Sequence, residues 1–214
     1  MDVYASEEEQ VEAIKKWWKQ NGKAIITGLI IGLGALSGWR YWQTYTTNKE
    51  VQASIAYQQV MSNVADHKKG AAKASGDKLI HDFPTSGYAD LTALILAGLA
   101  MEEDDHAKAT GYLQRVAEQG SMDESRDIAR IRLARLELAD GKAEAALQRL
   151  DGITDGDRLM TWLELKGDVL LALKRRDEAR NDYLQALTLA VSNGSNKALL
   201  QLKLDDLGQP GNTP

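Results

Sequence analysis

An uncharged stretch near the N-terminus constrains the fold of this chain more than any other feature. From Ala24 to Trp39 there is no charged residue, although the 214-residue chain as a whole is polar, with a mean hydropathy of −0.38. Basic and aromatic residues flank the stretch, as is typical of segments that end at a membrane–water interface. A helix from Gly22 to Trp42 would be about 30 Å long, which matches the hydrocarbon core of a bilayer. The sequence therefore predicts one transmembrane helix at residues 22–42.

Three other interpretations of this stretch were weighed against a membrane anchor. A dinucleotide-binding loop has the spacing GxGxxG, whereas Gly32, Gly34 and Gly38 have the spacing GxGxxxG. A buried helix of a soluble domain would leave the flanking aromatic and basic residues unexplained. A cleaved signal peptide, with small residues before Gly38, is the strongest alternative. The long acidic segment before the stretch and the aromatic residues after it favour an uncleaved anchor instead.

The basic residues predict how the anchor is oriented. Four lysines precede the stretch, whereas only Arg40 and Lys49 follow it within a comparable distance. Segments rich in lysine and arginine stay on the cytoplasmic side of a membrane. We therefore expect a single-pass inner-membrane protein with a cytoplasmic N-terminus and a periplasmic C-terminal domain.

The N-terminal segment and the glycines of the span give two further expectations. Residues 1–21 are expected to form an amphipathic helix on the cytoplasmic membrane surface, begun by a capping box of Ser6 and Glu9. A break at Asn21 and Gly22 is expected to separate this helix from the span. The span also contains pairs of glycines four residues apart, where another helix could approach closely. These predicted packing positions are Gly28, Gly32, Gly34 and Gly38.

Downstream of the span, the composition favours helix almost throughout, and the expected fold class is all-α. Alanine, leucine, glutamate, lysine, arginine and glutamine dominate, and the whole chain has three prolines. Turn-forming residues interrupt the helical pattern, and no stretch has the alternation that is typical of strands. Ser121 and Glu124 are expected to form a second capping box. The expected helices are 49–66, 70–82, 88–102, 105–118, 122–140, 142–151, 157–173, 177–191 and 195–207.

Small residues recur along this region with a spacing that indicates a structural repeat. Each unit has a small residue in its first helix, an alanine 12 positions later, and a large or aromatic residue four positions after that. The unit length is 37 and then 33 residues, which resembles the tetratricopeptide pattern of stacked helix pairs. We therefore predict a tetratricopeptide-like α-solenoid at residues 43–207, followed by a flexible tail at 208–214. The predicted helix-crossing positions are Ala97, Ala109, Ala134, Ala146, Gly167 and Ala179.

Composition and spacing argue against several classes of function. The chain has no cysteine, its three histidines have no metal-ligand spacing, and no catalytic combination of serine, histidine and aspartate is visible. The formal net charge of 26 − 31 = −5 gives no reason to expect nucleic acid. We expect no enzyme, metal or cofactor. Arg126 and Arg130 could line a binding groove of the solenoid or lie on an exposed, salt-bridged helix face.

Two stretches, YASEEEQVEAIKKWW and GLGALSGWRYW, together with the helical repeat, resemble a known family over the whole chain. The family is the ancillary subunit of the bacterial SecYEG translocon, or YfgM family. The resemblance implies a scaffold associated with the Sec translocon that hands unfolded or translocating proteins to periplasmic chaperones. It also implies partnership with a membrane-anchored peptidyl-prolyl isomerase-like chaperone and a link to a cytoplasmic stress-response regulator. The alternative is a structural adaptor of another cell-envelope assembly with the same architecture.

Overall fold

The secondary structure of the chain is helical wherever the structure describes it. The computed structural model describes residues 7–153, 159–193 and 197–208, and every regular element in these ranges is a helix. The chain divides into two compact units, Met1–Gln52 and Ala53–Pro214. The all-α fold class predicted from the sequence is confirmed.

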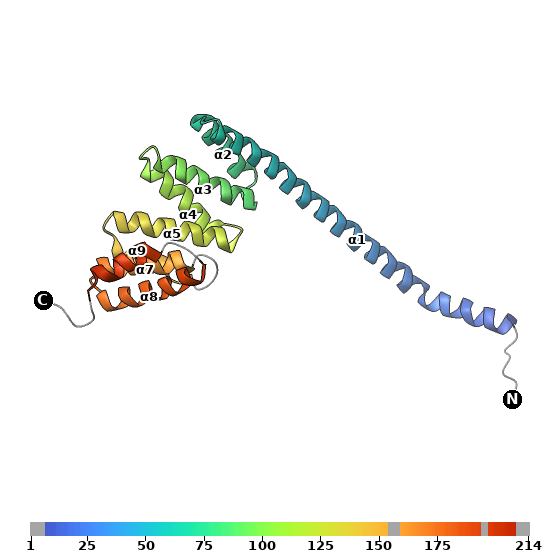
Figure 1. The fold of residues 1–214 in the computed structure, drawn as a ribbon. Coiled ribbons are helices and arrows are strands. Elements are labelled where there is room, and N and C mark those ends of the chain that lie inside the picture. Colours follow the sequence, from blue (N-terminus) through green and yellow to red (C-terminus); the bar gives the residue numbers. More distant parts are fainter. Residues whose placement is uncertain (1–6, 154–158, 194–196, 209–214) are drawn as a thin grey trace. The chain divides into compact units, whose positions relative to one another are not determined.

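The first helix, α1 (Glu7–Ala65), passes through Asn21 and Gly22 without interruption, so the break predicted there is wrong. The Asn21 side chain donates a hydrogen bond to the carbonyl oxygen of Trp17 at 3.0 Å and so stays inside the helical pattern. A Cβ at Gly22 would lie 3.2 Å from the ring of Trp18, which covers the glycine. Figure 1 shows that the blue, N-terminal part of α1 bends without losing its helical path.

The apolar stretch lies within α1 and is long and apolar enough to cross a membrane, judged by length and composition. The helix then continues to Ala65, whereas the sequence predicted a separate helix from residue 49. The Thr46 hydroxyl donates to the carbonyl oxygen of Trp42 at 3.1 Å, so it does not compete with the helix. Ser6 of the predicted capping box lies outside the described residues. A Cβ at Gly28, Gly32, Gly34 or Gly38 would meet nothing within 4 Å beyond its own helix.

The second unit is a stack of antiparallel helix pairs, which Figure 1 shows from teal to red. The end of α1 packs against α2, and each later helix packs mainly against its neighbours in sequence. Helix α5 also contacts both α3 and α7, so these three helices form one row. The predicted boundaries agree within two residues for α2 to α9. These helices are Lys69–Asp82, Gly87–Met101, His106–Gln119, Asp123–Ala139, Ala143–Leu150, Leu159–Ala172, Arg176–Asn193 and Lys197–Asp206.

The six predicted helix-crossing positions all lie in the interior of this stack. One of them is Gly167, where a Cβ would lie 2.4 Å from Cε1 of Tyr183. The Tyr183 side chain is fully buried, and its hydroxyl donates to Oδ1 of Asp168 at 2.7 Å. Glycine at 167 therefore leaves the space that the tyrosine ring fills. The other five positions are buried alanines, Ala97, Ala109, Ala134, Ala146 and Ala179.

Helix α9 closes the C-terminal end of the stack through one half-buried lysine. The Lys203 ammonium group binds Glu164 at 2.8 Å and Asp168 at 2.7 Å, both on α7. Burial alone would lower the pKa of Lys203, but the hydrogen bonds to the two carboxylates outweigh it and raise that pKa above its usual value. Leu200 is buried in the same cluster. The last helix is therefore held by both an apolar contact and a charged one.

The capping box predicted at Ser121 and Glu124 is wrong. Helix α5 begins after Met122, whose side chain makes no capping hydrogen bond. The backbone and hydroxyl of Ser121 instead donate to Oδ2 of Asp90 at 2.6 and 2.7 Å. Asp90 is fully buried on α3 and lies 3.6 Å from the guanidinium group of Arg115. A long-range contact between α3 and the turn before α5 thus takes the place of the local cap.

Candidate protein-binding groove

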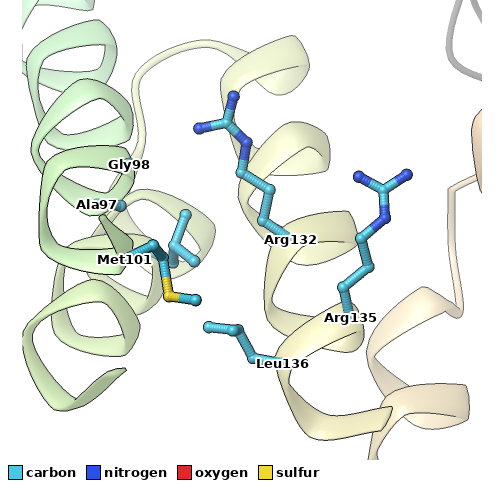
Figure 2. Close-up of a pocket in the computed structure, with 7 residues that line it drawn as sticks. Ala97, Gly98, Met101, Arg132, Arg135 and Leu136 are labelled. Carbon is cyan, nitrogen blue, oxygen red and sulfur yellow. The ribbon is translucent and has the colours of Figure 1, made fainter. Parts of the chain in front are cut away.

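A cleft opens on the second unit where α3 faces α5. Its volume is about 370 Å³, within the range of protein binding pockets. Figure 2 shows Met101 of α3 and Leu136 of α5 reaching toward each other across it. The same view shows the guanidinium groups of Arg132 and Arg135 extending from one side of α5. An apolar floor therefore lies beside two cationic side chains.

A second cleft adjoins the first along the same row of helices. Its volume is about 460 Å³, and residues from the end of α1, from α3 and from α5 line it. Both clefts are lined by Gly98 and Arg132, so they are neighbours along α3 and α5, and we treat them as one groove. We refer to it as the A-helix groove, because the first helices of the successive pairs line it. Its apolar residues include Tyr57, Leu91, Ile95, Met101, Ile128 and Leu136.

Gly98 lies in the middle of the groove, where both clefts are lined by it. It lies in the interior of α3, where glycine weakens a helix relative to alanine by about 1 kcal/mol. A Cβ at this position would meet nothing within 4 Å, so packing of the core does not require glycine here. Gly167 differs, because a neighbouring ring occupies the space of its missing side chain. The open space at Gly98 belongs to the groove.

The two groove arginines differ from the other arginines of α5 in their partners. Arg126 and Arg130 form ion pairs with Asp123 and Asp127, each one helical turn earlier. Arg132 donates to the carbonyl oxygen of Leu94 at 3.0 Å and has no ion pair within the described part of the chain. Arg135 likewise has no carboxylate partner among the described residues. Burial, and next the charge of Arg135, lower the pKa of Arg132. Since no described carboxylate pairs with either arginine, the positive charge of the groove is not neutralised.

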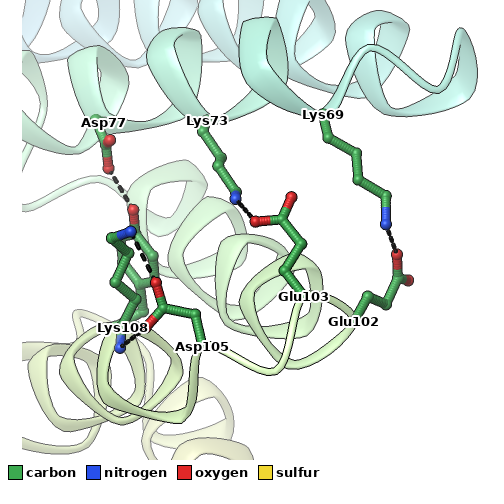
Figure 3. A network of polar contacts seen from close by, with 8 residues as sticks. Lys69, Lys73, Asp77, Glu102, Glu103, Asp105 and Lys108 are labelled. Atoms are coloured by element: carbon green, nitrogen blue, oxygen red, sulfur yellow. Dashed lines mark hydrogen bonds and ion pairs between the residues drawn. The ribbon is translucent and has the colours of Figure 1, made fainter.

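A separate network of charges joins α2 to the turn between α3 and α4 (Figure 3). Lys69 binds Glu102 at 2.8 Å, and Lys73 binds Glu103. The hydroxyl of Tyr112 on α4 donates to Asp77 of α2 at 2.7 Å.

The pKa shifts in this network follow from these contacts. Hydrogen bonding to Lys73 lowers the pKa of Glu103, and hydrogen bonding to Glu102 raises the pKa of Lys69. Because these charges neutralise one another, the network holds the first two helix pairs together and leaves little net charge for a partner.

Comparison with known proteins agrees with this architecture. Residues 15–209 match the family described as a tetratricopeptide repeat-like domain. The chain is 30% identical to the ancillary SecYEG translocon subunit of Escherichia coli over 97% of its length and 99% of the relative's. It is 31% identical to the subunits of the same name from Haemophilus influenzae and Aggregatibacter actinomycetemcomitans, over 86% and 96% of its length and 90% and 100% of theirs. The chain belongs to the family of ancillary SecYEG translocon subunits. No solved structure matches it.

The positions predicted for this family member fall in three places. Of the helix-crossing positions, Ala97 contributes to the groove lining, and the others lie in the core between helices. The four glycines of the span lie in the first unit. Arg126 and Arg130 lie on a salt-bridged helix face, which was one of the two alternatives for them. Arg132 and Arg135 were not singled out from the sequence.

A local signal could have found the groove arginines. On a helix, ion pairs form between residues three or four positions apart. Arg126 and Arg130 each have an aspartate three positions earlier, whereas neither Arg132 nor Arg135 has an acidic residue three or four positions away on either side. The unpaired arginines were therefore identifiable as cations without a local partner. Within the described residues, no group of three or more metal-ligating side chains lies together.

Proposed function

We propose that this chain is a membrane-anchored adaptor that associates with the SecYEG translocon and binds partner proteins through its A-helix groove. The names of the relatives in Escherichia coli and Haemophilus influenzae support the association with SecYEG. The groove along α3 and α5 carries the binding part of the proposal, since stacked helix pairs commonly use such surfaces for protein recognition. A tetratricopeptide-like domain that binds other proteins has no need of catalysis, and we infer a role without enzymatic activity.

The proposed location is the inner membrane, with the N-terminus in the cytoplasm and the repeat domain in the periplasm. The apolar stretch of α1 supports one membrane crossing, and the four lysines before it support this orientation. Protease added to spheroplasts should then digest residues 50–214 and spare residues 1–21. A protected repeat domain would contradict the orientation. A mature protein that begins near Gly38 would instead show that the apolar stretch is a signal peptide.

The partners proposed on the periplasmic side are unfolded or translocating proteins and a membrane-anchored peptidyl-prolyl isomerase-like chaperone. On the cytoplasmic side, the proposed partner is a stress-response regulator. The resemblance of the chain to its family suggests all of these, and the groove provides a surface on which an extended protein segment could bind. The alternative function is a structural adaptor of another envelope assembly, for which the same architecture would serve.

Site-specific photocrosslinking in native membranes separates these functions. A photoreactive amino acid at Leu33, in the span, should crosslink to SecYEG, and one at Ile95 or Leu136, in the groove, should crosslink to a periplasmic protein. Gly111 is the control position, because it is exposed on α4 and does not line either cleft. Crosslinks from the span to envelope proteins other than SecYEG would favour the alternative function. Equal crosslinking from the groove and from Gly111 would leave the groove without a role in binding.

A further inference from the structure

We propose that the A-helix groove binds an extended segment of a partner protein in which acidic and apolar side chains alternate. Arg132 and Arg135 bind the carboxylates of this segment, and Met101 and Leu136 contact its apolar side chains. The inference rests on the proposed function and adds to it the chemistry that the groove selects.

The charge of the groove is the first step of the argument. Residues 43–214 carry 21 basic and 26 acidic side chains, so this part of the chain has a net charge of 21 − 26 = −5. In such an acidic environment most basic side chains find a carboxylate. Five arginines of the second unit do so, and Arg176 and Arg180 donate to the carbonyl oxygen of Leu207. Arg132 and Arg135 leave most of their guanidinium N–H groups without an acceptor among the described residues. The paired arginines are Arg115, Arg126, Arg130, Arg149 and Arg175.

The placement of the two arginines matches the repeat of an extended chain. Residues three positions apart on a helix have Cβ atoms about 5–6 Å apart. Alternate residues of an extended chain are separated by about 6.5–7 Å and point to the same side. Two acidic residues at alternate positions can therefore each reach one guanidinium group. The intervening side chains then remain available for contact with the apolar residues between α3 and α5, which lie beside the arginines (Figure 2).

The form of the groove favours an extended chain over a helix. Helices α3 and α5 are in contact, so the space between them admits single side chains and not the full width of about 10–12 Å of another helix. Because the two clefts adjoin at Gly98 and Arg132, an extended chain can lie along both of them. A through-running segment presents acidic side chains, whereas a chain end would present its terminal carboxylate only once.

A pair of peptides tests the inference directly. Fluorescein-labelled Ser-Leu-Glu-Leu-Glu-Leu-Glu-Ser and its counterpart with glutamine in place of glutamate differ only in charge. Binding to the full chain in lipid nanodiscs is measured by fluorescence anisotropy. We expect the acidic peptide to bind more tightly, and the double variant Arg132→Gln/Arg135→Gln to weaken its binding about tenfold to hundredfold. The glutamine peptide should bind both proteins equally.

Matched variants separate the inference from the proposed function. Arg130→Gln removes an arginine of the same helix that already has a carboxylate partner, so it should leave both affinities unchanged. Arg135→Gln alone should lower acidic-peptide affinity and cannot disturb a hydrogen bond, since none is made within the described residues. Gly98→Leu should fill the groove and weaken the binding of both peptides. Gly111→Leu, at an equally open helix position, should leave the binding of both unchanged.

Two results would overturn the inference. In the first, both peptides bind equally, the arginine variants leave this binding unchanged, and Gly98→Leu abolishes it. The groove would then select apolar segments without regard to charge, and the proposed adaptor function would stand. In the second, neither peptide binds, and the crosslinks from the groove are unaltered in the Gly98→Leu variant. The groove would then have no role in partner binding, and both the inference and the proposed function of the groove would be wrong. In all variants, circular dichroism of the full chain should match that of the parent protein.

Discussion

Replacing Gly167 by alanine tests the packing on which the repeat is built. A Cβ at this position would lie 2.4 and 2.6 Å from two atoms of the Tyr183 ring, closer than side-chain atoms approach in folded proteins. The ring cannot easily move away, since Tyr183 is fully buried and its hydroxyl is bonded to Asp168. The added methyl group must therefore displace either the ring or the crossing of α7 and α8.

The expected change in the free energy of unfolding combines two destabilising contributions and one stabilising contribution. Overpacking a core typically costs about 1–3 kcal/mol. A weakened hydrogen bond between Tyr183 and Asp168 adds about 0.5–1.5 kcal/mol. The higher helix propensity of alanine offsets about 1 kcal/mol of this. We expect a net loss of about 1–3 kcal/mol in the free energy of unfolding, and a fall in Tm of about 2–4 °C for each kcal/mol.

The assay compares this variant with Gly111→Ala in the full chain. Gly111 is also inside a helix, but a Cβ there would meet nothing within 4 Å. The same substitution should therefore stabilise the protein at Gly111, by up to about 1 kcal/mol, and destabilise it at Gly167. Thermal and urea unfolding followed by circular dichroism at 222 nm measure both. Equal or higher stability of Gly167→Ala would refute the packing argument.

Three further predictions concern the core, the last helix and the span. Ala146→Leu should lower the free energy of unfolding by about 1–3 kcal/mol, whereas Ala145→Leu, at an exposed neighbour, should change it little. Equal unfolding curves for the two variants would contradict the register proposed for the repeat. Because the pKa of Lys203 is raised on folding, its ion pairs should stabilise the chain fully below about pH 10 and lose effect as pH rises through the folded pKa. Between pH 8 and pH 11, the free energy of unfolding measured in urea should fall more for the parent protein than for Lys203→Met. Equal decreases in the two proteins would contradict this. Gly28→Leu/Gly32→Leu should reduce co-purification with membrane partners and leave unfolding of the repeat domain unchanged, and wild-type yields would place the interface elsewhere.

The helices could be predicted from the sequence because local signals specify them. Turn-forming residues separate the helical segments, and the boundaries of α2 to α9 came within two residues of the observed ones. The failure at Asn21 and Gly22 has a local cause that propensity scales do not include. The ring of Trp18 covers the glycine, and the Asn21 amide bonds the preceding turn. Two residues that usually end a helix therefore continue one.

Long-range contacts account for what the sequence did not predict. The motif of Ser121 and Glu124 fits a capping box, but Asp90, 31 positions earlier, binds Ser121 instead. A buried carboxylate gains more from two short hydrogen bonds than an exposed helix end gains from a cap, because water can satisfy the exposed end. The groove was likewise invisible in the sequence, since it depends on how α3 lies beside α5.

The presence or absence of a carboxylate partner separates the charges that stabilise this fold from those available to a binding partner. A cation with a carboxylate one turn away already has a neutralising contact, and a new partner must compete with it. Arg126 and Arg130 are of this kind. Arg132 and Arg135 have neither a local nor a distant carboxylate within the described residues, and they stand beside exposed apolar surface. An incoming acidic group therefore gains an ion pair there without breaking one, so of the four arginines the second pair offers the greater gain on binding.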